Sequence, residues 1–157
     1  MTVGIYRMRA RDVMTQRADT IRSDETIHAA IEKMVNFDLS VLPVVNRAGE
    51  CVGVLTKTDI VRLAGYLEHS EEVEPRNETA ALFFGVSLDE VTKETVEEVM
   101  TKHVISVGED DPVTTIADIM LKYEIHHVPV CSAQNHVIGV VSSMDLVQAI
   151  RAPVPTD

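Results

Sequence analysis

Two stretches of the sequence decide the fold: Gly53-Val54-Leu55-Thr56-Lys57-Thr58-Asp59 and Gly139-Val140-Val141-Ser142-Ser143-Met144-Asp145. Both read glycine, two apolar residues, a hydroxyl residue, two variable positions and aspartate. The apolar start is typical of a buried strand, and a hydroxyl residue three positions before a carboxylate is typical of a helix N-terminus. Each stretch therefore predicts a strand that passes directly into a helix.

The second stretch follows the first by 86 positions, and the same offset aligns the rest of the chain with itself without a gap. The matches fall on residues that shape the backbone: Val13-Met14-Thr15 on Val99-Met100-Thr101, Asp24 on Asp110, Met34 on Met120 and Pro43-Val44 on Pro129-Val130. Self-similarity at one fixed period is the signature of a repeated supersecondary unit. The chain therefore consists of two copies of one unit.

Each copy predicts the element order β-α-β-β-α, which makes the fold class α/β. After a short extended segment (18–22 or 104–107), apolar residues recur at helical spacing, as in Ile27, Ala30 and Met34. Two strands and a second helix follow. The expected strands are Val41 to Val45, Cys51 to Thr56, His127 to Cys131 and Val137 to Ser142. A single copy buries too little surface to be stable alone, so the two copies should pack against each other.

The copies are separated by a charge-rich segment. We expect domains at residues 9–67 and 96–151, with an acidic insertion at 68–95. The middle of the insertion, 80–86, is too apolar for a free linker and predicts a partly helical segment. Its Phe83-Phe84 pair is expected to pack either on a second subunit or on its own module, with neither favoured.

Composition restricts the partners. The chain has 157 residues, 45% of them apolar, and a net charge of −11, which opposes binding to nucleic acid or to anionic lipid. No apolar run approaches the roughly 20 residues of a membrane span. Cys51 and Cys131 lie in apolar runs outside any C-x-x-C motif, which favours buried small hydrophobic residues over metal ligands or catalysts. We expect a reduced, cytoplasmic protein.

Together these features resemble the cystathionine β-synthase (CBS) domain, in the tandem form called a Bateman module. The resemblance covers about residues 9–151 without the insertion, and rests on the paired motifs above together with Leu42-Pro43-Val44-Val45 and Val128-Pro129-Val130. It implies two sheets about a pseudo-twofold axis and two clefts for adenosine derivatives such as AMP, ADP, ATP or S-adenosylmethionine. It also implies a homodimer of modules. With nothing else attached, we expect a stand-alone pair that carries no cofactor and acts on a partner protein in trans.

The aspartates suit a ribose in this reading. An ionised Asp59 or Asp145 accepts two hydrogen bonds, which matches the two adjacent hydroxyls of the sugar. The hydroxyl three residues earlier, and the free amides of the first helical turn, can reach a phosphate. The same spacing fits an ordinary N-terminal helix cap, which spacing alone favours.

The resemblance assigns further residues to the clefts. Leu39 and Ile125 would sandwich the base or belong to the ordinary core, and backbone groups near Thr20 and Ser106 would read its edge. Copy two has His126-His127, which can donate to a phosphate, where copy one has Ser40-Val41. Without an arginine in either pair, we expect a monophosphate, AMP.

Each predicted cleft combines parts of both copies. The first cleft draws on Ser142, Met144, Asp145, Thr15, Thr20, Ser40 and His126. The second draws on Thr56, Thr58, Asp59, Thr101, Ser106, Ile125 and His126. Lys57 adds a cation near the first. The complete set of expected ligand-binding residues adds Leu39 and His127 to these.

Three other functions compete with an AMP sensor. One is a ligand-free interaction or oligomerisation module, and another is an S-adenosylmethionine sensor. The third is an enzyme, because His28, His69, His103, His126, His127 and His136 with two cysteines could supply chemistry. No metalloprotease, nucleophile-elbow or P-loop motif is present, so we expect no catalysis. A metal site at His126 and His127 is disfavoured, because neighbouring strand residues point to opposite faces.

Overall fold

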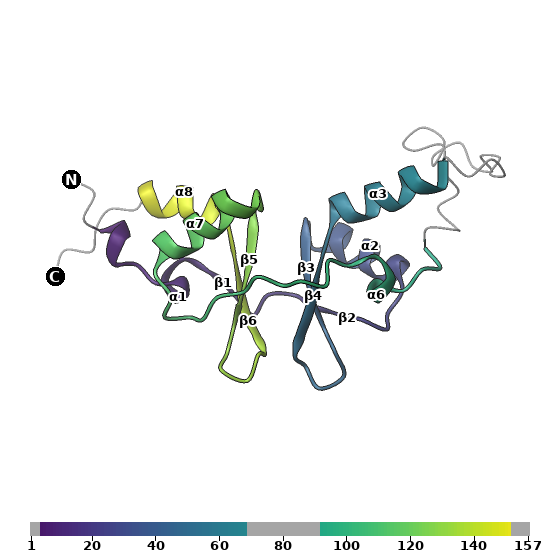
Figure 1. Ribbon diagram of the computed structural model, residues 1–157, viewed down its shortest axis with the longest axis horizontal. Helices are drawn as coiled ribbons and strands as arrows, with labels where there is room; N and C mark the ends of the chain where they lie inside the picture. The colour runs from purple at the N-terminus through teal and green to yellow at the C-terminus, as the bar shows by residue number, and fades with distance from the viewer. Residues whose placement is uncertain (1–3, 69–91, 152–157) are drawn as a thin grey trace. The chain divides into compact units, whose positions relative to one another are not determined.

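The computed structural model of the chain describes residues 4–68 and 92–151. Almost all of the predicted insertion, including Phe83-Phe84, lies outside these residues. The described chain forms two compact units, shown in Figure 1. Unit 1 contains residues 4–19, 49–51 and 105–151, and unit 2 contains residues 20–48, 52–68 and 92–104.

Unit 1 is built around two long antiparallel strands. Its elements are η1 (Ile5–Arg7), α1 (Ala10–Val13), β1 (Thr15–Gln16), α7 (Val113–Tyr123), β5 (His127–Cys131), β6 (Val137–Ser142) and α8 (Ser143–Arg151). Strands β1, β6 and β5 form an antiparallel sheet in that order. Helices α7 and α8 lie beside the β5–β6 hairpin (Figure 1). The core is purely apolar and centres on Ile116, Val128, Val130 and Val141.

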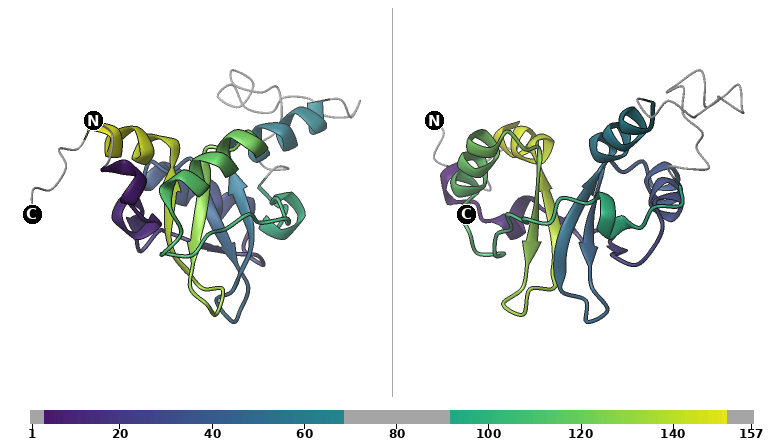
Figure 2. Two further views of the ribbon diagram at one scale, coloured as in Figure 1. Left: turned by 60° about the vertical axis from the view of Figure 1, so that its left-hand side comes forward. Right: turned by 45° about the vertical axis from the view of Figure 1, so that its right-hand side comes forward.

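Unit 2 repeats this plan with the corresponding residues. Its elements are β2 (Ile21–Arg22), α2 (Ile27–Asn36), β3 (Val41–Val45), β4 (Cys51–Thr56), α3 (Lys57–Glu68) and α6 (Val96–Val99). The first residue of β4, Cys51, belongs to unit 1. The sheet order is β2-β3-β4, with β2 parallel to β3. Figure 2 shows α2, α3 and α6 on one side of β3 and β4. Their apolar faces enclose a core that includes Ile27, Met34, Leu42, Leu55 and Val96.

The first segment of each predicted copy crosses to the other copy. In unit 1, Ala10 N donates to Asp111 O at 2.9 Å, and β1 pairs with β6. In unit 2, the equivalent Val96 N donates to Glu25 O at 2.8 Å, and Thr101 pairs with Val54. Each unit therefore contains the main strands and helices of one copy, completed by the first segment of the other. These short segments were not predicted, because two to four residues are too few to show a period.

The four main strands have the predicted bounds, whereas the extended segments of both copies are shorter than expected. In copy one, β2 makes a two-residue parallel ladder, and Ser23 N then donates to Val45 O at 3.0 Å. In copy two only Val107 pairs, with Val130, and it forms an isolated bridge. The ladder ends one step earlier, so no strand is formed over 104–107.

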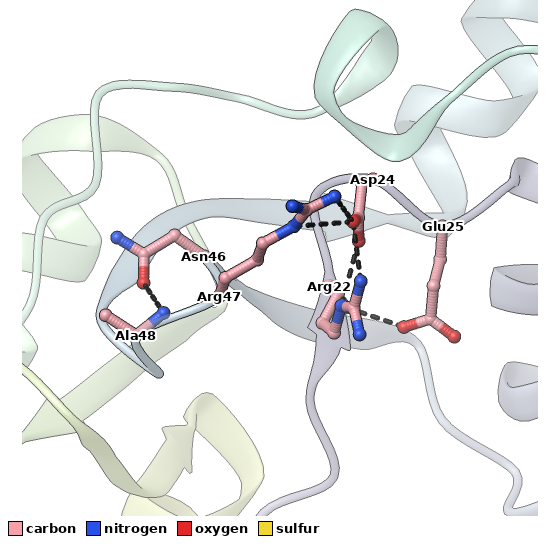
Figure 3. Close-up of polar contacts among 6 residues, drawn as sticks. All are labelled: Arg22, Asp24, Glu25, Asn46, Arg47 and Ala48. Atoms are coloured by element: carbon pink, nitrogen blue, oxygen red, sulfur yellow. Dashed lines mark hydrogen bonds and ion pairs between the residues drawn. The ribbon is translucent and has the colours of Figure 1, made fainter.

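The predicted start of α2 is held by a cap and by charged side chains. Thr26 Oγ accepts a hydrogen bond from Ala29 N at 3.2 Å. Figure 3 shows Arg22 and Arg47, from β2 and from the turn after β3, both pointing at the carboxylate of Asp24. The closest approaches are 2.5 Å from Arg22 and 3.3 Å from Arg47. The hydrogen bond from Arg22 lowers the pKa of Asp24 below its usual value. The cluster is exposed, so solvent screens it.

Candidate functional site

The two strand-to-helix motifs form the same hydrogen-bonded cap. In unit 2, Thr56 N and Thr56 Oγ both donate to Asp59 Oδ2 at 2.8 Å, and Asp59 N donates back to Thr56 Oγ at 3.2 Å. In unit 1, Ser142 and Asp145 form the same three bonds at 2.7, 2.8 and 3.1 Å. The helix cap expected from the spacing is therefore present in both copies.

The cap leaves part of each aspartate available. All of these bonds go to Oδ2, and Oδ1 of Asp59 and of Asp145 accepts none from the described residues. Both side chains are half-buried. A ribose could use Oδ1 without breaking the cap. The hydroxyl is less free, because its proton points to the aspartate; Thr56 or Ser142 must leave the cap before it donates to a phosphate.

The first-turn amides are also partly used. Lys57 N donates to Ser40 O at 3.1 Å, and the equivalent Ser143 N donates to His126 O at 2.9 Å. The third residue of each helix, Asp59 or Asp145, uses its amide in the cap. Within the described residues, the first-turn amide that makes no such bond is that of Thr58 in α3 and that of Met144 in α8. The side chains of both residues are exposed.

A close backbone approach brings a threonine next to each motif. Thr101 N donates to Val54 O at 2.9 Å, and Thr15 lies opposite Val140. The approach requires glycine in β4 and β6. A Cβ on Gly53 would collide with Met100 Sδ, and a Cβ on Gly139 would lie 2.6 Å from Met14 Sδ. The Val-Met-Thr and glycine motifs are therefore two sides of one contact.

The residues expected to read the base differ between the copies. The carbonyl oxygen of Thr20 accepts a hydrogen bond from Lys33 Nζ at 2.6 Å. Ser106 instead donates its hydroxyl to the sulfur of Cys131. A ligand that used the Thr20 carbonyl would have to share it with Lys33, whereas copy two has Ile119 at the position of Lys33.

Leu39 and Ile125 serve the core at least in part. Leu39 packs against the core of unit 2, and Ile125 packs against that of unit 1. Both side chains are only half-buried. Each could therefore also contact a base.

The histidine pair of copy two lies where β5 begins. His126 is exposed and His127 is half-buried. Burial lowers the pKa of His127, and the neighbouring His126 acts in the same direction, while Asp145 partly opposes them. The neutral form of His127 is therefore favoured in the unit.

The structure divides the predicted ligand-binding residues evenly. Unit 1 holds Thr15, Ser106, Ile125, His126, His127, Ser142, Met144 and Asp145; unit 2 holds Thr20, Leu39, Ser40, Thr56, Lys57, Thr58, Asp59 and Thr101. Thr15 accompanies Asp145, and Thr101 accompanies Asp59. Ser40 immediately precedes β3 in the Asp59 unit, and its carbonyl oxygen accepts the hydrogen bond from Lys57 N at the start of α3. Its predicted use with Asp145 stays a prediction, as does that of Thr20.

Sequence reasoning missed a contact between the two cysteines. Both are buried, as expected, but they also touch: the Cys51 thiol donates a hydrogen bond to Cys131. Their separation in the chain hides this contact. Over residues 4–68 and 92–151, no group of three or more His, Cys, Asp or Glu side chains could hold a metal ion. In the same residues no helix is long and apolar enough to span a membrane.

Comparison with known protein families finds one match. The CBS domain pattern matches the chain twice, at residues 10–66 and 96–152. Among curated proteins, the L-aspartate semialdehyde sulfurtransferase of Methanocaldococcus jannaschii is 29% identical over 87% of this chain. The chain spans only 22% of that enzyme's length. An uncharacterized protein of the same organism is 27% identical over 91% of each chain.

Solved structures show the same fold. The CBS domain pair of protein MJ0100, in complex with 5′-methylthioadenosine and S-adenosyl-L-methionine, is 28% identical, with a TM-score of 0.68 over 90% of this chain and 94% of that one. The CBS domain of a membrane protein from Sphaerobacter thermophilus is 28% identical, with a TM-score of 0.73 over 96% and 91%. CBSX2 in complex with AMP has a TM-score of 0.69 over 90% and 95%, and at 21% identity shows the fold alone.

Proposed function

This chain belongs to the CBS domain family and carries two copies of the domain, and on that premise we propose that it is a regulatory module that binds an adenosine derivative, with AMP favoured. Ligand binding changes the affinity for a partner protein by stabilising one of two conformations. The observation that carries the proposal is the duplicated cap, in which each aspartate keeps one oxygen for a ligand.

The cap matches the chemistry of an adenosine ribose. Asp59 and Asp145 are half-buried carboxylates, and hydrogen bonds to a charged acceptor are stronger than neutral ones. The first-turn amides of Thr58 and Met144, two exposed residues, are suited to an anion such as a phosphate. The likeness to MJ0100, whose structure holds two adenosine derivatives, supports the same class of ligand.

The choice of AMP rests on the polar residues beside the caps. Lys57 and His126 each supply a donor for a phosphate. No arginine lies in either residue pair before the Pro-Val motif, where the higher charge of a triphosphate would need one. S-adenosylmethionine is the second candidate, because MJ0100 was solved with it and because it needs no phosphate donor.

A second copy of the chain is the expected assembly partner. Met144, Val147 and Ile150 of α8 are 60%, 47% and 64% exposed, which is unusual for three large apolar side chains at helical spacing on one short helix. The contact between the two chains of the dimer would transmit a ligand-induced change. Light scattering at micromolar concentration tests for a dimer.

Thermal unfolding with millimolar AMP, ADP, ATP and S-adenosylmethionine tests the ligand. A ligand present at about 100 times its Kd adds roughly 2.7 kcal/mol, which raises the midpoint by about 5–10 °C at this chain length. Asp59→Asn and Asp145→Asn keep an oxygen for the cap and remove the charge. Asp24→Asn makes the same chemical change at an exposed ion cluster and serves as the control.

The outcomes separate the candidates. An AMP shift that is lost in Asp59→Asn or Asp145→Asn, and kept in Asp24→Asn, supports the proposal and identifies the copy used. A shift with S-adenosylmethionine alone favours the second candidate. No shift with any compound overturns ligand sensing and favours an interaction module without a ligand.

A further inference from the structure

The backbone beside Cys51 is fixed to the turn between β5 and β6. Cys51 N donates to Asn135 O at 2.9 Å, and Asn135 Nδ2 donates back to Cys51 O at 3.0 Å. Glu50 forms a bridge with His136 immediately beside this pair. Residues 49–51 therefore belong to unit 1, together with Cys131 at the end of β5.

The backbone of Cys131 is fixed as well. Cys131 N donates to Val107 O at 2.8 Å, which holds the end of β5 against the segment that contains Ser106. Both cysteine side chains are 7% exposed and neither is in a disulfide. The backbones that carry the two buried thiols are thus each fixed by hydrogen bonds within unit 1.

The thiols interact directly. A hydrogen bond from Cys51 lowers the pKa of the Cys131 thiol to about 7, a hydrogen bond from Ser106 acts in the same direction, and burial opposes both. Thiolate is the form of cysteine that reacts with oxidants. Cys131 is therefore the reactive member of the pair, and Cys51 is positioned to resolve its oxidised form.

Packing alone does not account for sulfur at these positions. The residues equivalent to Cys131 and Cys51 in the other copy are Val45 and Val137, and Thr20 takes the place of Ser106. Valine thus occupies both equivalent places in the same strands. The set Cys51, Cys131 and Ser106 therefore has two thiols, whereas the equivalent set Val137, Val45 and Thr20 has none.

We propose that Cys51 and Cys131 form an oxidative modification site, which a hydroperoxide converts to a reversible intramolecular disulfide. The Cys131 thiolate attacks one oxygen of the peroxide, the O–O bond breaks, and hydroxide leaves and is protonated to water. The Cys51 sulfur then attacks the sulfur of the resulting sulfenic acid. The S–O bond breaks, and hydroxide takes the Cys51 proton and leaves as the second water.

The balance of this reaction is complete. Two thiols and one hydrogen peroxide give one disulfide and two waters, so both sulfurs lose one electron and both peroxide oxygens gain one. The disulfide joins the first residue of β4 to the last residue of β5. It closes a long loop of the chain, which restricts the unfolded state and should raise the midpoint of thermal unfolding by about 5–15 °C.

Peptide mapping after oxidation tests the site. Full-length protein is treated with hydrogen peroxide, blocked with an alkylating agent and digested with trypsin without reduction. The expected product is a peptide in which residues 48–57 are linked to residues 123–151. The intact chain should lose the mass of two hydrogen atoms on oxidation and regain it when dithiothreitol is added. Cys51→Val and Cys131→Val, which install the residue of the other copy, should each abolish both the link and the rise in midpoint.

Ser106→Ala separates positioning from packing. Ser106 is exposed, so its loss should leave the midpoint of the reduced protein unchanged while slowing disulfide formation severalfold. The proposal is overturned if both thiols remain alkylatable, if oxidation stops at added oxygen atoms, or if the link joins two chains. An equal rate in Ser106→Ala overturns the role given to the hydroxyl. None of these results depends on nucleotide binding.

Discussion

The two caps of the molecule are alike, whereas the extended segments around Thr20 and Ser106 are not. Thr56 with Asp59 and Ser142 with Asp145 make the same three hydrogen bonds. By contrast, Lys33 binds the carbonyl of Thr20, while Ser106 binds a cysteine. The common part sets the backbone at the strand-to-helix junction. The part that differs gives the two copies different hydrogen-bond partners at these equivalent positions.

The largest expected loss of stability comes from substitutions at Gly53 and Gly139, each of which lies close to a methionine side chain. Gly53→Ala and Gly139→Ala should each cost about 1–3 kcal/mol of unfolding free energy, because the new methyl group overpacks the contact with methionine. Urea unfolding measures the loss. At Gly139 the methyl group would also lie 2.8 Å from the backbone oxygen of Thr15, whereas at Gly53 the corresponding distance to Thr101 O is 3.1 Å.

A second substitution makes that comparison quantitative. Met100→Ala removes the flexible atoms that oppose a methyl group at Gly53. In the Met100→Ala protein, Gly53→Ala should therefore cost less unfolding free energy than it does in the wild type. Met14→Ala should recover less in Gly139→Ala, because the backbone oxygen of Thr15 cannot move away as easily. Equal recovery at both positions would mean that the two approaches are equivalent.

The caps themselves should respond equally to substitution. Thr56→Ala and Ser142→Ala each remove a hydroxyl that accepts one hydrogen bond and donates another, so each should cost about 1 kcal/mol. Urea unfolding with matched slopes measures both. A cost confined to one copy would show that the likeness of the hydrogen bonds does not extend to their energies.

The smallest expected effect concerns pH, and it belongs to copy two alone. Burial lowers the pKa of His127 in the folded chain, so the unfolded chain binds its proton more readily. The contribution is complete above about pH 6.5 and is lost as the pH falls. His127→Gln should flatten the fall in stability between about pH 6.5 and 5, and copy one has the non-titrating Val41 there.

A second uncharged substitution supplies the control for this effect. His127→Asn removes the same titrating group with a different side chain and should flatten the fall in stability as His127→Gln does. Thermal unfolding across the pH range measures all three proteins. A His127→Gln profile that matches the wild type would remove the pH difference between the copies.

The sequence predicts the strands well because their pattern is local. Runs such as Val41–Val45 and Val137–Ser142 are apolar, bounded by turn residues and found twice, and the structure has them at the same bounds. The caps were predictable for the same reason, since four consecutive positions contain the whole motif. His28 and His103, whose places at a helix start and in a loop indicate surface positions, are both exposed.

The missed features depend on residues far apart in the chain. The crossing of Ala10–Val13 into the unit of copy two, and the contact of Cys51 with Cys131, have no periodic signal. The bond from Lys33 to Thr20 is also absent from the motif, because it depends on how α2 lies beside β2. Local patterns determine which elements form, but the side chains that face a bound molecule depend on which distant segments meet.

The crossing of the first segments has a consequence for how the protein is made. Residues 10–16 leave the ribosome well before the loop and strand that receive them, around Asp111 and Val140. Unit 2 must likewise wait for residues 96–101 before its sheet and helices are complete. Each unit thus keeps an unpaired edge until the segment that completes it has been synthesised, and the contacts between segments so far apart in the chain make folding slower than the small size of each unit suggests.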